Sequence, residues 1–293
     1  MKAEAIPTVD QLRKYLQPCR AKGQTIGLVP TMGALHEGHA ALIEQARAEC
    51  DALVVSIFVN PLQFGPDEDL ESYPRDLQQD LVFCDLRGVD AVFSPSDEEI
   101  YPGAQHTFVE HGVEGTRLCG ESRPGHFRGV ATVVLKLFNI VQPDRAYFGE
   151  KDIQQLAVLD RMKRDLNLPI DIVQVPTKRE ADGLAISSRN QYLNSEERQA
   201  AGVLYRALRI ARQRVADGNL DPSVATGAAR TVLELEPLAE VEYLEIVDPD
   251  LMQPVDEIKG PVRVVSAIRI GRTRLIDNVL CDMPRIVRSR GRK

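Results

Sequence analysis

Short apolar runs alternate with amphipathic stretches along the first two thirds of the chain. A run without polar alternation is typical of a strand that is buried on both faces of a parallel sheet. The stretches between the runs carry apolar residues at helical spacing, as at Val9, Leu12 and Leu16, with Thr8 as a predicted N-cap. This alternation predicts a parallel sheet covered by helices on both faces. The predicted strands are 26–29, 51–59, 89–93, 145–148 and 170–175, and the predicted helices are 8–22, 40 onward, 73–88, 130–141 and 153–167.

The pattern changes after residue 177, where a charged, turn-like segment begins. Two helical segments at 195–218 and 222–236 precede strands at 241–247 and 262–270. We therefore expect two domains, 1–177 and 178–293, the second smaller and of the α+β class. Residues 284–293 are basic and poor in apolar side chains, so we expect a disordered tail there.

Composition narrows the class of protein. The chain has 293 residues and a net charge of −7, which argues against a general nucleic-acid or membrane-surface binder. No apolar stretch is long enough to span a membrane, and the start lacks the plan of a signal peptide. The five cysteines are scattered and odd in number, which is typical of reduced thiols. We expect a cytoplasmic enzyme.

The most informative stretch follows the first predicted strand. Pro30–Gly33 is a predicted turn, and Gly33, His36, Gly38 and His39 lie in it or in the first turn of the next helix. Free N–H groups at a helix start attract anions, and glycines let a phosphate approach the backbone. We expect both histidines to contact a nucleotide phosphate as protonated imidazoles. A zinc site and a purely structural helix cap are the alternatives, although the spacing and the missing third ligand speak against zinc.

Further candidates follow later strands. Lys151 lies in Gly149–Asp152 between a predicted strand and a helix, where Asp152 is a possible N-cap. Ser187, Ser188 and Arg189 offer hydroxyl and guanidinium donors to phosphate. The amides of Asn60, Gln63 and Gln155 can hold hydroxyls or a carboxylate. Taken alone, Lys151, the Ser187–Arg189 triplet and each amide could also be ordinary surface residues. The loop 122–129, expected to lead into the helix 130–141, carries Arg123, His126 and Arg128, which either approach anions or decorate a mobile loop.

Six stretches together resemble the pantothenate synthetase (pantoate–β-alanine ligase) family of the H-x-G-H nucleotidylyltransferase superfamily. They are Val29-PTMGALHEGH-Ala40, Ser56-IFVNPLQF-Gly65, Ser122-RPGHFRGV-Val130, Tyr147-FGEKDIQQL-Leu156, Asp182-GLAISSRN-Gln191 and Arg274-LIDN-Asn278. They occur in family order and show no departure at the motif positions. The resemblance implies a Rossmann-like first domain and a C-terminal lid that excludes water.

The resemblance also implies a reaction. ATP and Mg²⁺ would activate pantoate as a pantoyl adenylate, and β-alanine would then displace AMP. His39, His36 and Lys151 would be the catalytic residues, with His39 the general acid, described more cautiously as a charge and proton donor. Gln63, Gln155 and Asn60 would hold pantoate, Gln63 would also lie near β-alanine, and a homodimer is implied. The implied ATP site is Met32, Gly33, Ala34, Leu35, His36, Glu37, Gly38, His39, Gly149, Glu150, Lys151, Asp152, Lys178, Ile186, Ser187, Ser188 and Arg189.

Two alternatives remain. Another nucleotidylyltransferase of the superfamily would share the helix-start histidines without the amide set of Asn60, Gln63 and Gln155. A nucleotide sensor without catalysis would need no pocket for a second substrate. Formation of AMP that depends on both acids separates the expected enzyme from both.

Overall fold

The structure is a computed structural model that describes residues 4–66 and 68–282. These residues form two compact units. The first contains the chain through Arg179 together with Ile186–Ser188, and the second contains Glu180–Ala185 and the residues from Arg189 onward. The segment 186–188, assigned to the C-terminal part on sequence grounds, therefore groups with the first unit. The basic tail 284–293 lies outside the described residues.

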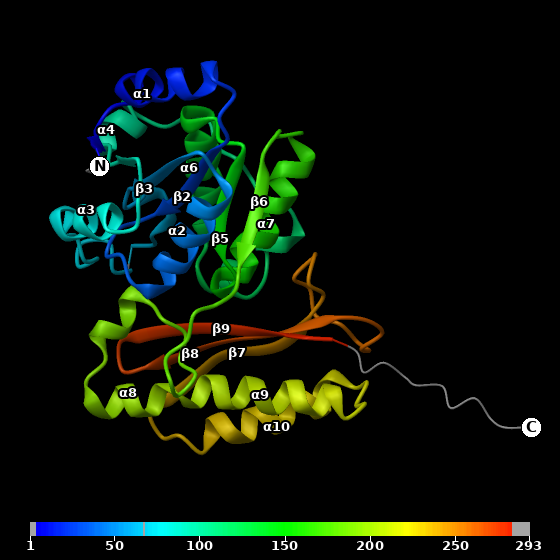
Figure 1. Cartoon of the computed structure of the whole chain (residues 1–293). Helices are drawn as coiled ribbons and strands as arrows, with labels where there is room; N and C mark the ends of the chain where they lie inside the picture. Colours follow the sequence, from blue (N-terminus) through cyan, green and yellow to red (C-terminus); the bar gives the residue numbers. More distant parts are fainter. Residues whose placement is uncertain (1–3, 67, 283–293) are drawn as a thin grey trace, which may run out of the picture. The chain divides into compact units, whose positions relative to one another are not determined.

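A six-stranded parallel sheet forms the centre of the first unit, in the order β1-β4-β3-β2-β5-β6 (Figure 1). Its strands are β1 (Glu4–Ile6), β2 (Ile26–Thr31), β3 (Ala52–Ile57), β4 (Ala91–Phe93), β5 (Arg145–Gly149) and β6 (Asp171–Val175). The expected Rossmann-like α/β fold is confirmed. Because β2 pairs with both β3 and β5, the carboxyl ends of these three strands are neighbours. Ligands of parallel sheets bind beyond such ends.

Helices cover this sheet and supply the rest of its core. Leu42, Ile43 and Ala46 of α2 pack with Cys84 of α3 and Val55 of β3 in one buried cluster. The helix α6 packs against α1, α7 and β2. Both contacts follow from the apolar stripes seen in the sequence. The helices are α1 (Val9–Ala21), α2 (Glu37–Glu49), α3 (Leu77–Asp85), α4 (Asp97–Ile100), α5 (Cys119–Ser122), α6 (His126–Val141) and α7 (Ile153–Asp165).

Several boundaries differ from the sequence expectations. The strand β1 was missed because three residues carry no periodic signal. The helix expected at 73–88 starts only at Leu77, where the Asp76 side chain caps it by accepting from Gln79 N–H. The loop expected at 122–129 is partly helical, since α6 begins at His126. Pro30, expected in the turn, is still part of β2, where it lies opposite Ser56.

The second unit joins helices to an antiparallel sheet, as expected for its class. The strands β7 (Ala239–Val247), β8 (Val262–Ile270) and β9 (Thr273–Cys281) follow one another in the sheet, and α9 packs on β8 and β9 while α10 packs on α9 and β7 (Figure 1). The strand β9 was not predicted. The helical segment expected at 195–218 is divided at Gly202 into α8 (Ser195–Ala201) and α9 (Val203–Ala216), and α10 spans Pro222–Glu234.

Candidate active site

The turn after β2 is stabilised by one buried carboxylate that lies far away in the sequence. Gly33 and Ala34 have φ values of 85° and 50°, a left-handed conformation that favours glycine at the first position. Asp80 of α3 accepts the N–H groups of Ala34 and Leu35 at 3.0 and 2.8 Å. Asp80 is 3% exposed, and burial raises its pKa although both N–H donors act against this. The carboxylate therefore fixes the shape of the turn.

This arrangement changes the expected anion site. Free N–H groups were expected at the start of the helix, but in the turn before it the N–H groups of Ala34 and Leu35 point to Asp80, and Gly33 N–H points to the Thr31 hydroxyl at 3.2 Å. His36 and Gly38 N–H groups are bonded as well, to histidine rings. Side-chain donors must therefore provide much of any attraction for a phosphate.

The two histidines form a reciprocal cap at the start of α2. His36 Nδ1 accepts the N–H of Gly38 at 3.1 Å, and His39 Nδ1 accepts the N–H of His36 at 3.2 Å. The rings stack with their centroids 4.1 Å apart. The helix-cap alternative is thus part of the structure. It leaves the Nε2 atom of each ring outside the cap, so a cap and a ligand contact are compatible.

The cap also determines the protonation of both rings. A backbone N–H can only donate, so each Nδ1 must be an acceptor and each proton must lie on Nε2. Burial, followed by the positive charge of Lys151, lowers the pKa of His36 to about 4. Burial, His36 and Lys151 hold the pKa of His39 well below its ordinary value of 6.5. The expectation of protonated imidazoles is therefore wrong at neutral pH, where two neutral rings present Nε2–H donors.

Lys151 lies beyond the carboxyl end of β5, in the short helix η3 (Glu150–Asp152). Its positive charge lowers the pKa of both His36 and His39, so the ammonium group acts electrostatically on both rings. Its Nζ is 3.8 Å from the Asp152 carboxylate. The Asp152 charge in turn acts on His36 and on His126. Gly149 precedes this turn with an ordinary φ of −80°. The structure thus brings the polar groups of two strand ends together.

The amides expected to hold a second substrate follow β3. Asn60 caps the short helix η1 (Pro61–Gln63) and is 1% exposed. Its Nδ2 donates to Gln63 Oε1 at 3.0 Å, and Gln63 Nε2 lies 3.2 Å from the sulfur of Met32. Met32 belongs to the turn that leads to His36, so Gln63 lies beside that turn.

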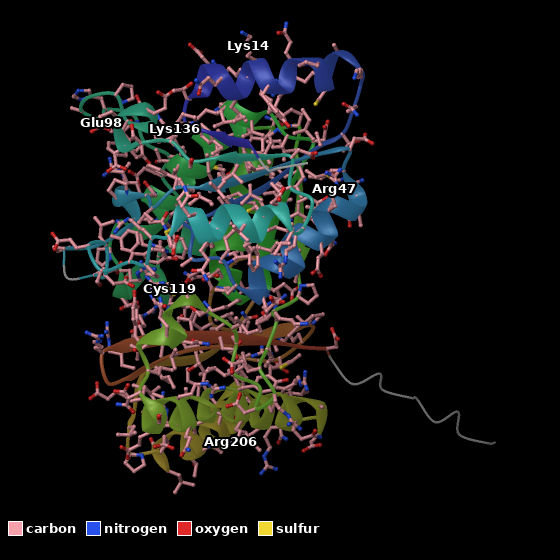
Figure 2. All side chains as sticks on the ribbon, turned by 60° about the vertical axis from the view of Figure 1, so that its left-hand side comes forward. Lys14, Arg47, Glu98, Cys119, Lys136 and Arg206 are labelled. Carbon is pink, nitrogen blue, oxygen red and sulfur yellow. The ribbon has the colours of Figure 1, made fainter. Side chains whose placement is uncertain are left out.

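The third expected amide, Gln155, lies in the first turn of α7. The residue is half-buried, and its side chain has no hydrogen-bond partner among the described residues. Its neighbour Gln154 is buried and bonded through both its oxygen and its nitrogen: it accepts the N–H of Cys119 (labelled in Figure 2) and donates to the carbonyls of Glu114 and Arg117. Gln154 therefore anchors α7, while the Gln155 amide remains available to a ligand.

Arg123 and His126 are not exposed side chains of a mobile loop, because both donate hydrogen bonds to the backbone carbonyl of Gln63. The Gln63 carbonyl accepts from His126 Nδ1 at 2.8 Å and from Arg123 at 3.3 Å. Arg123 also donates to both Glu68 oxygens at 2.6 Å and to His126 Nε2 at 3.0 Å. Burial and Arg123 lower the pKa of His126 to about 3. Arg128 is engaged elsewhere, since it lies 2.7 Å from the Glu110 carboxylate and over the Phe108 ring.

The segment 186–188 passes close to the start of α2. The Ile186 N–H donates to the Lys178 carbonyl at 3.0 Å, and a Cβ placed on Gly38 would lie 3.8 Å from the Ile186 carbonyl oxygen. Ser188 Oγ is 3.3 Å from the Tyr73 hydroxyl. Ser187 lies between them, whereas Arg189 belongs to the second unit and is not placed against this turn. Glu37 directs its carboxylate to Arg87, 3.1 Å away, so its backbone alone is left for the expected nucleotide contact.

Two kinds of feature are absent from residues 4–66 and 68–282. No group of three or more His, Cys, Asp or Glu side chains is arranged to hold a metal ion, which removes support for the zinc alternative. None of the described helices has the length and apolar character that crossing a membrane requires. All five cysteines are free thiols.

Three polar residues around this site, Asp80, Tyr101 and Glu68, were not predicted from the sequence. Each lies far along the chain from the residue it holds, and none belongs to a recognisable motif. Only Asp80 gives a signal in the sequence, because it is an acidic residue that interrupts the buried face of a predicted helix. Its partners at Ala34 and Leu35 become visible only in three dimensions.

Comparisons with known proteins identify the family. The sequence model of the pantoate-beta-alanine ligase family matches residues 4–280. Pantothenate synthetase from Heliobacterium modesticaldum is 53% identical over 280 residues, covering 95% of this chain and 99% of the relative. The corresponding protein from Pelotomaculum thermopropionicum is 50% identical over 273 residues, covering 93% and 97%.

Solved structures give the same result. Pantothenate synthetase from Thermus thermophilus superposes with a TM-score of 0.90 at 48% identity, covering 94% of this chain and 98% of that chain. Pantoate-beta-alanine ligase from Francisella tularensis, solved with beta-gamma ATP and beta-alanine, gives 0.78 at 36% identity, covering 95% and 97%. On sequence and on structure, the chain belongs to the pantoate–β-alanine ligase family.

Proposed function

We propose that this protein is a pantothenate synthetase, which condenses pantoate with β-alanine at the expense of ATP. The observation that carries the proposal is the meeting of three strand ends. The charge of Lys151 after β5 reaches His36 and His39 after β2, and Gln63 after β3 contacts Met32 of the same turn. Cationic and neutral donors are thereby collected where a triphosphate and a carboxylate would have to meet.

In the first step, a pantoate carboxylate oxygen attacks the α-phosphorus of ATP, and the bond to pyrophosphate breaks. The two anions repel each other, so fixed donors must offset the charge that builds up on the phosphate oxygens. His36 and His39 donate their Nε2–H groups and Lys151 supplies the positive charge. Ser187, Ser188 and Arg189 are proposed as further donors to the triphosphate, beside the backbone of Met32–His39, Gly149–Asp152, Lys178 and Ile186.

The second step forms the amide bond. The β-alanine amine attacks the acyl carbon of the pantoyl adenylate, and AMP leaves. Gln63 and Gln155 are proposed to hold pantoate through both steps, with Gln63 also near β-alanine. Neutral amides suit this task because they bind a carboxylate or hydroxyl without a charge that would compete for the phosphates.

Mg²⁺ is proposed as an ion that arrives with ATP. Mg²⁺ at phosphate-transfer sites keeps several waters and binds mainly through substrate phosphates and one or two carboxylates. The part of the chain that is described holds no larger cluster of ligands, which fits this mode, and no protein ligand is assigned. Bound there, the ion would neutralise charge on the β and γ phosphates.

The test is a coupled assay for AMP with the purified protein. We expect AMP to be released only when ATP, pantoate and β-alanine are all present. Exchange of labelled pyrophosphate into ATP should need pantoate but not β-alanine. Turnover without pantoate, or with another acceptor of nucleotidyl groups in its place, would contradict the proposal. The homodimer, the cytoplasmic location and the exclusion of water by the C-terminal part remain predictions, the first of them open to analytical ultracentrifugation.

A further inference from the structure

The side chain of Asn60 has no hydrogen-bonding capacity left for a substrate. Its oxygen accepts the Leu62 N–H at 3.3 Å and the Tyr101 hydroxyl at 2.7 Å. Its nitrogen donates to the Gly129 carbonyl at 3.2 Å and to Gln63 Oε1 at 3.0 Å. An asparagine amide offers two acceptor and two donor positions. All four are used inside the protein, and the residue is 1% exposed.

The orientation of this amide is determined by its backbone partners. The Leu62 N–H can only donate, so the atom facing it must be the Asn60 oxygen. The Gly129 carbonyl can only accept, so the atom facing it must be the Asn60 nitrogen. A flipped amide would place like groups against each other at both contacts and leave two buried backbone groups unpaired.

The orientation of the Asn60 amide determines the orientation of the Gln63 amide. Because the Asn60 nitrogen faces the Gln63 side chain, the Gln63 atom in that contact must be its oxygen. The Gln63 NH₂ group then lies on the other side, near the Met32 sulfur, which is only a weak acceptor. The Gln63 side chain is half-buried, so its NH₂ group remains able to turn to a ligand oxygen.

The outer end of the chain of hydrogen bonds is Tyr101, which follows α4. Burial and then the charge of Asp97 raise its pKa, so its hydroxyl keeps its proton. Its ring lies beside Phe58 and under the ammonium of Lys136, 5.2 Å from the ring centroid. Figure 2 labels Lys136 on α6. These contacts hold the ring independently of the hydroxyl, which is therefore free to serve Asn60.

We propose that Tyr101 and Asn60 are positioning residues that orient the Gln63 amide so that its NH₂ group faces the pantoate carboxylate. The inference rests on the proposed function and makes it more specific. Pantoate then meets a donor instead of an oxygen, which is the only orientation that does not repel an anion. Asn60 assists without contacting the substrate.

The experiment measures pantoate binding by calorimetry, with the pantoate dependence of pyrophosphate exchange as a second readout. Tyr101→Phe keeps the ring and removes only the hydroxyl. We expect it to weaken pantoate binding about fivefold to tenfold, since one hydrogen bond is lost, with the KM for ATP unchanged. In a Gln63→Ala background the same change should have no further effect, because the residue it orients is gone.

The matched control is Tyr15→Phe, which removes a hydroxyl bonded to the Asp90 carbonyl at 3.1 Å. It should leave pantoate binding unchanged. Equal pantoate affinity of Tyr101→Phe and the wild type would overturn the proposal, and so would an undiminished effect of Tyr101→Phe in the Gln63→Ala background.

A second variant tests the orientation without any change at Tyr101. In Gln63→Glu the group facing pantoate becomes a carboxylate oxygen, so binding should fall well below that of Gln63→Ala. If Gln63→Glu bound pantoate as tightly as Gln63→Ala, or more tightly, Gln63 would have to present its oxygen to pantoate. That result would overturn the proposed orientation. A wild-type protein that binds no pantoate at all would instead overturn the proposed function, and the orientation toward pantoate with it.

Discussion

Asp80 accepts a hydrogen bond of 2.8 Å from the backbone N–H of Leu35, 45 residues earlier in the chain. Its second oxygen holds the Ala34 N–H, so one carboxylate stabilises the whole turn before His36. In Asp80→Asn one oxygen becomes an NH₂ group, which would face an N–H donor. Losing such a bond costs about 1–3 kcal/mol, so we expect the KM for ATP to rise about tenfold.

The measurement is steady-state kinetics with ATP varied at saturating pantoate. Asp217→Asn is the control, because Asp217 is exposed and its contact with Gln213 can persist in the amide. An unchanged KM for ATP in Asp80→Asn would show that the turn keeps its shape without the carboxylate.

The two nitrogens of His39 have separate tasks that substitution can divide. Nδ1 accepts the His36 N–H and caps α2, whereas Nε2–H is the proposed donor to phosphate. An asparagine at this position would place its oxygen where Nδ1 is now, so His39→Asn keeps the cap and loses the donor. We expect pyrophosphate exchange to fall about 100-fold or more in both His39→Asn and His39→Ala, as is typical for losing one such stabiliser.

Only the alanine variant should lose stability as well, by about 1 kcal/mol, because only there is the cap removed. Urea unfolding measures this difference. Normal exchange in His39→Asn would contradict the donor role, and equal stability of the two variants would contradict the capping role.

The sequence predicted the positions of His36 and His39 better than their protonation and hydrogen bonding. The run 26–29 and the helical spacing after Ala40 were enough to place His36 and His39 at a strand–helix junction, because both signals are local. The protonation of the rings depends on burial and on Lys151, more than 100 residues away, and was predicted wrongly. The hydrogen bonds from the N–H groups of the turn to Asp80 could not be foreseen, because Asp80 meets them only through the tertiary fold.

The same distinction applies to strands and helices. Apolar runs such as 51–59 and 89–93 identified the central strands and β4, while β1 spans only three residues, gives no periodic signal and was missed. The role of Arg123 could not be decided from its neighbours in sequence. It depends on Glu68 and on the carbonyl of Gln63, which α6 and η1 bring together.

Lys151→Met should raise the pKa of His36 from about 4, because the lysine charge is the second cause of its depression after burial. The pKa can be followed by the NMR shift of the His36 ring as pH varies. Lys163→Met is the control, since Lys163 lies near Asp171, with 3.8 Å between the charged atoms, and does not act on His36. A His36 pKa that is the same in both variants would contradict the closeness of Lys151 to the ring.

His126 should make the protein less stable in mild acid. Unfolded, it takes up a proton near its ordinary pKa of 6.5, but folded only near pH 3, because of burial and Arg123. As pH falls from 7 to 5 the unfolded state therefore gains protons that the folded state does not, and the free energy of unfolding decreases. His126 contributes about 2 kcal/mol to this decrease.

Urea unfolding at both pH values measures the effect. The decrease should be smaller by about this amount in His126→Gln, whose side chain can still donate to the Gln63 carbonyl but cannot bind a proton. His106→Gln, at an exposed position, is the control and should retain the wild-type decrease. An equal decrease in His126→Gln and the wild type would refute the assignment.

Gly129 allows η1 to lie directly on α6, and this contact determines the position of Gln63. A Cβ at residue 129 would overlap the Leu62 carbonyl oxygen and lie 2.7 Å from the Gln63 nitrogen. Both neighbours are backbone, which cannot turn aside as a side-chain end can, so Gly129→Ala must push η1 away. Asn60 would also lose its bond to the Gly129 carbonyl.

Pantoate-dependent exchange in Gly129→Ala should fall about 100-fold, the scale of loss that follows when a positioned group is displaced by about 1 Å. ATP binding should be retained, because the His36 turn does not rest on Gly129. Gly227→Ala in α10 is the matched control: no atom lies within 4 Å of its added Cβ, so it should stabilise the helix by up to about 1 kcal/mol without affecting exchange. If Gly129→Ala behaved like Gly227→Ala in pyrophosphate exchange, the packing of η1 on α6 would not be what places Gln63.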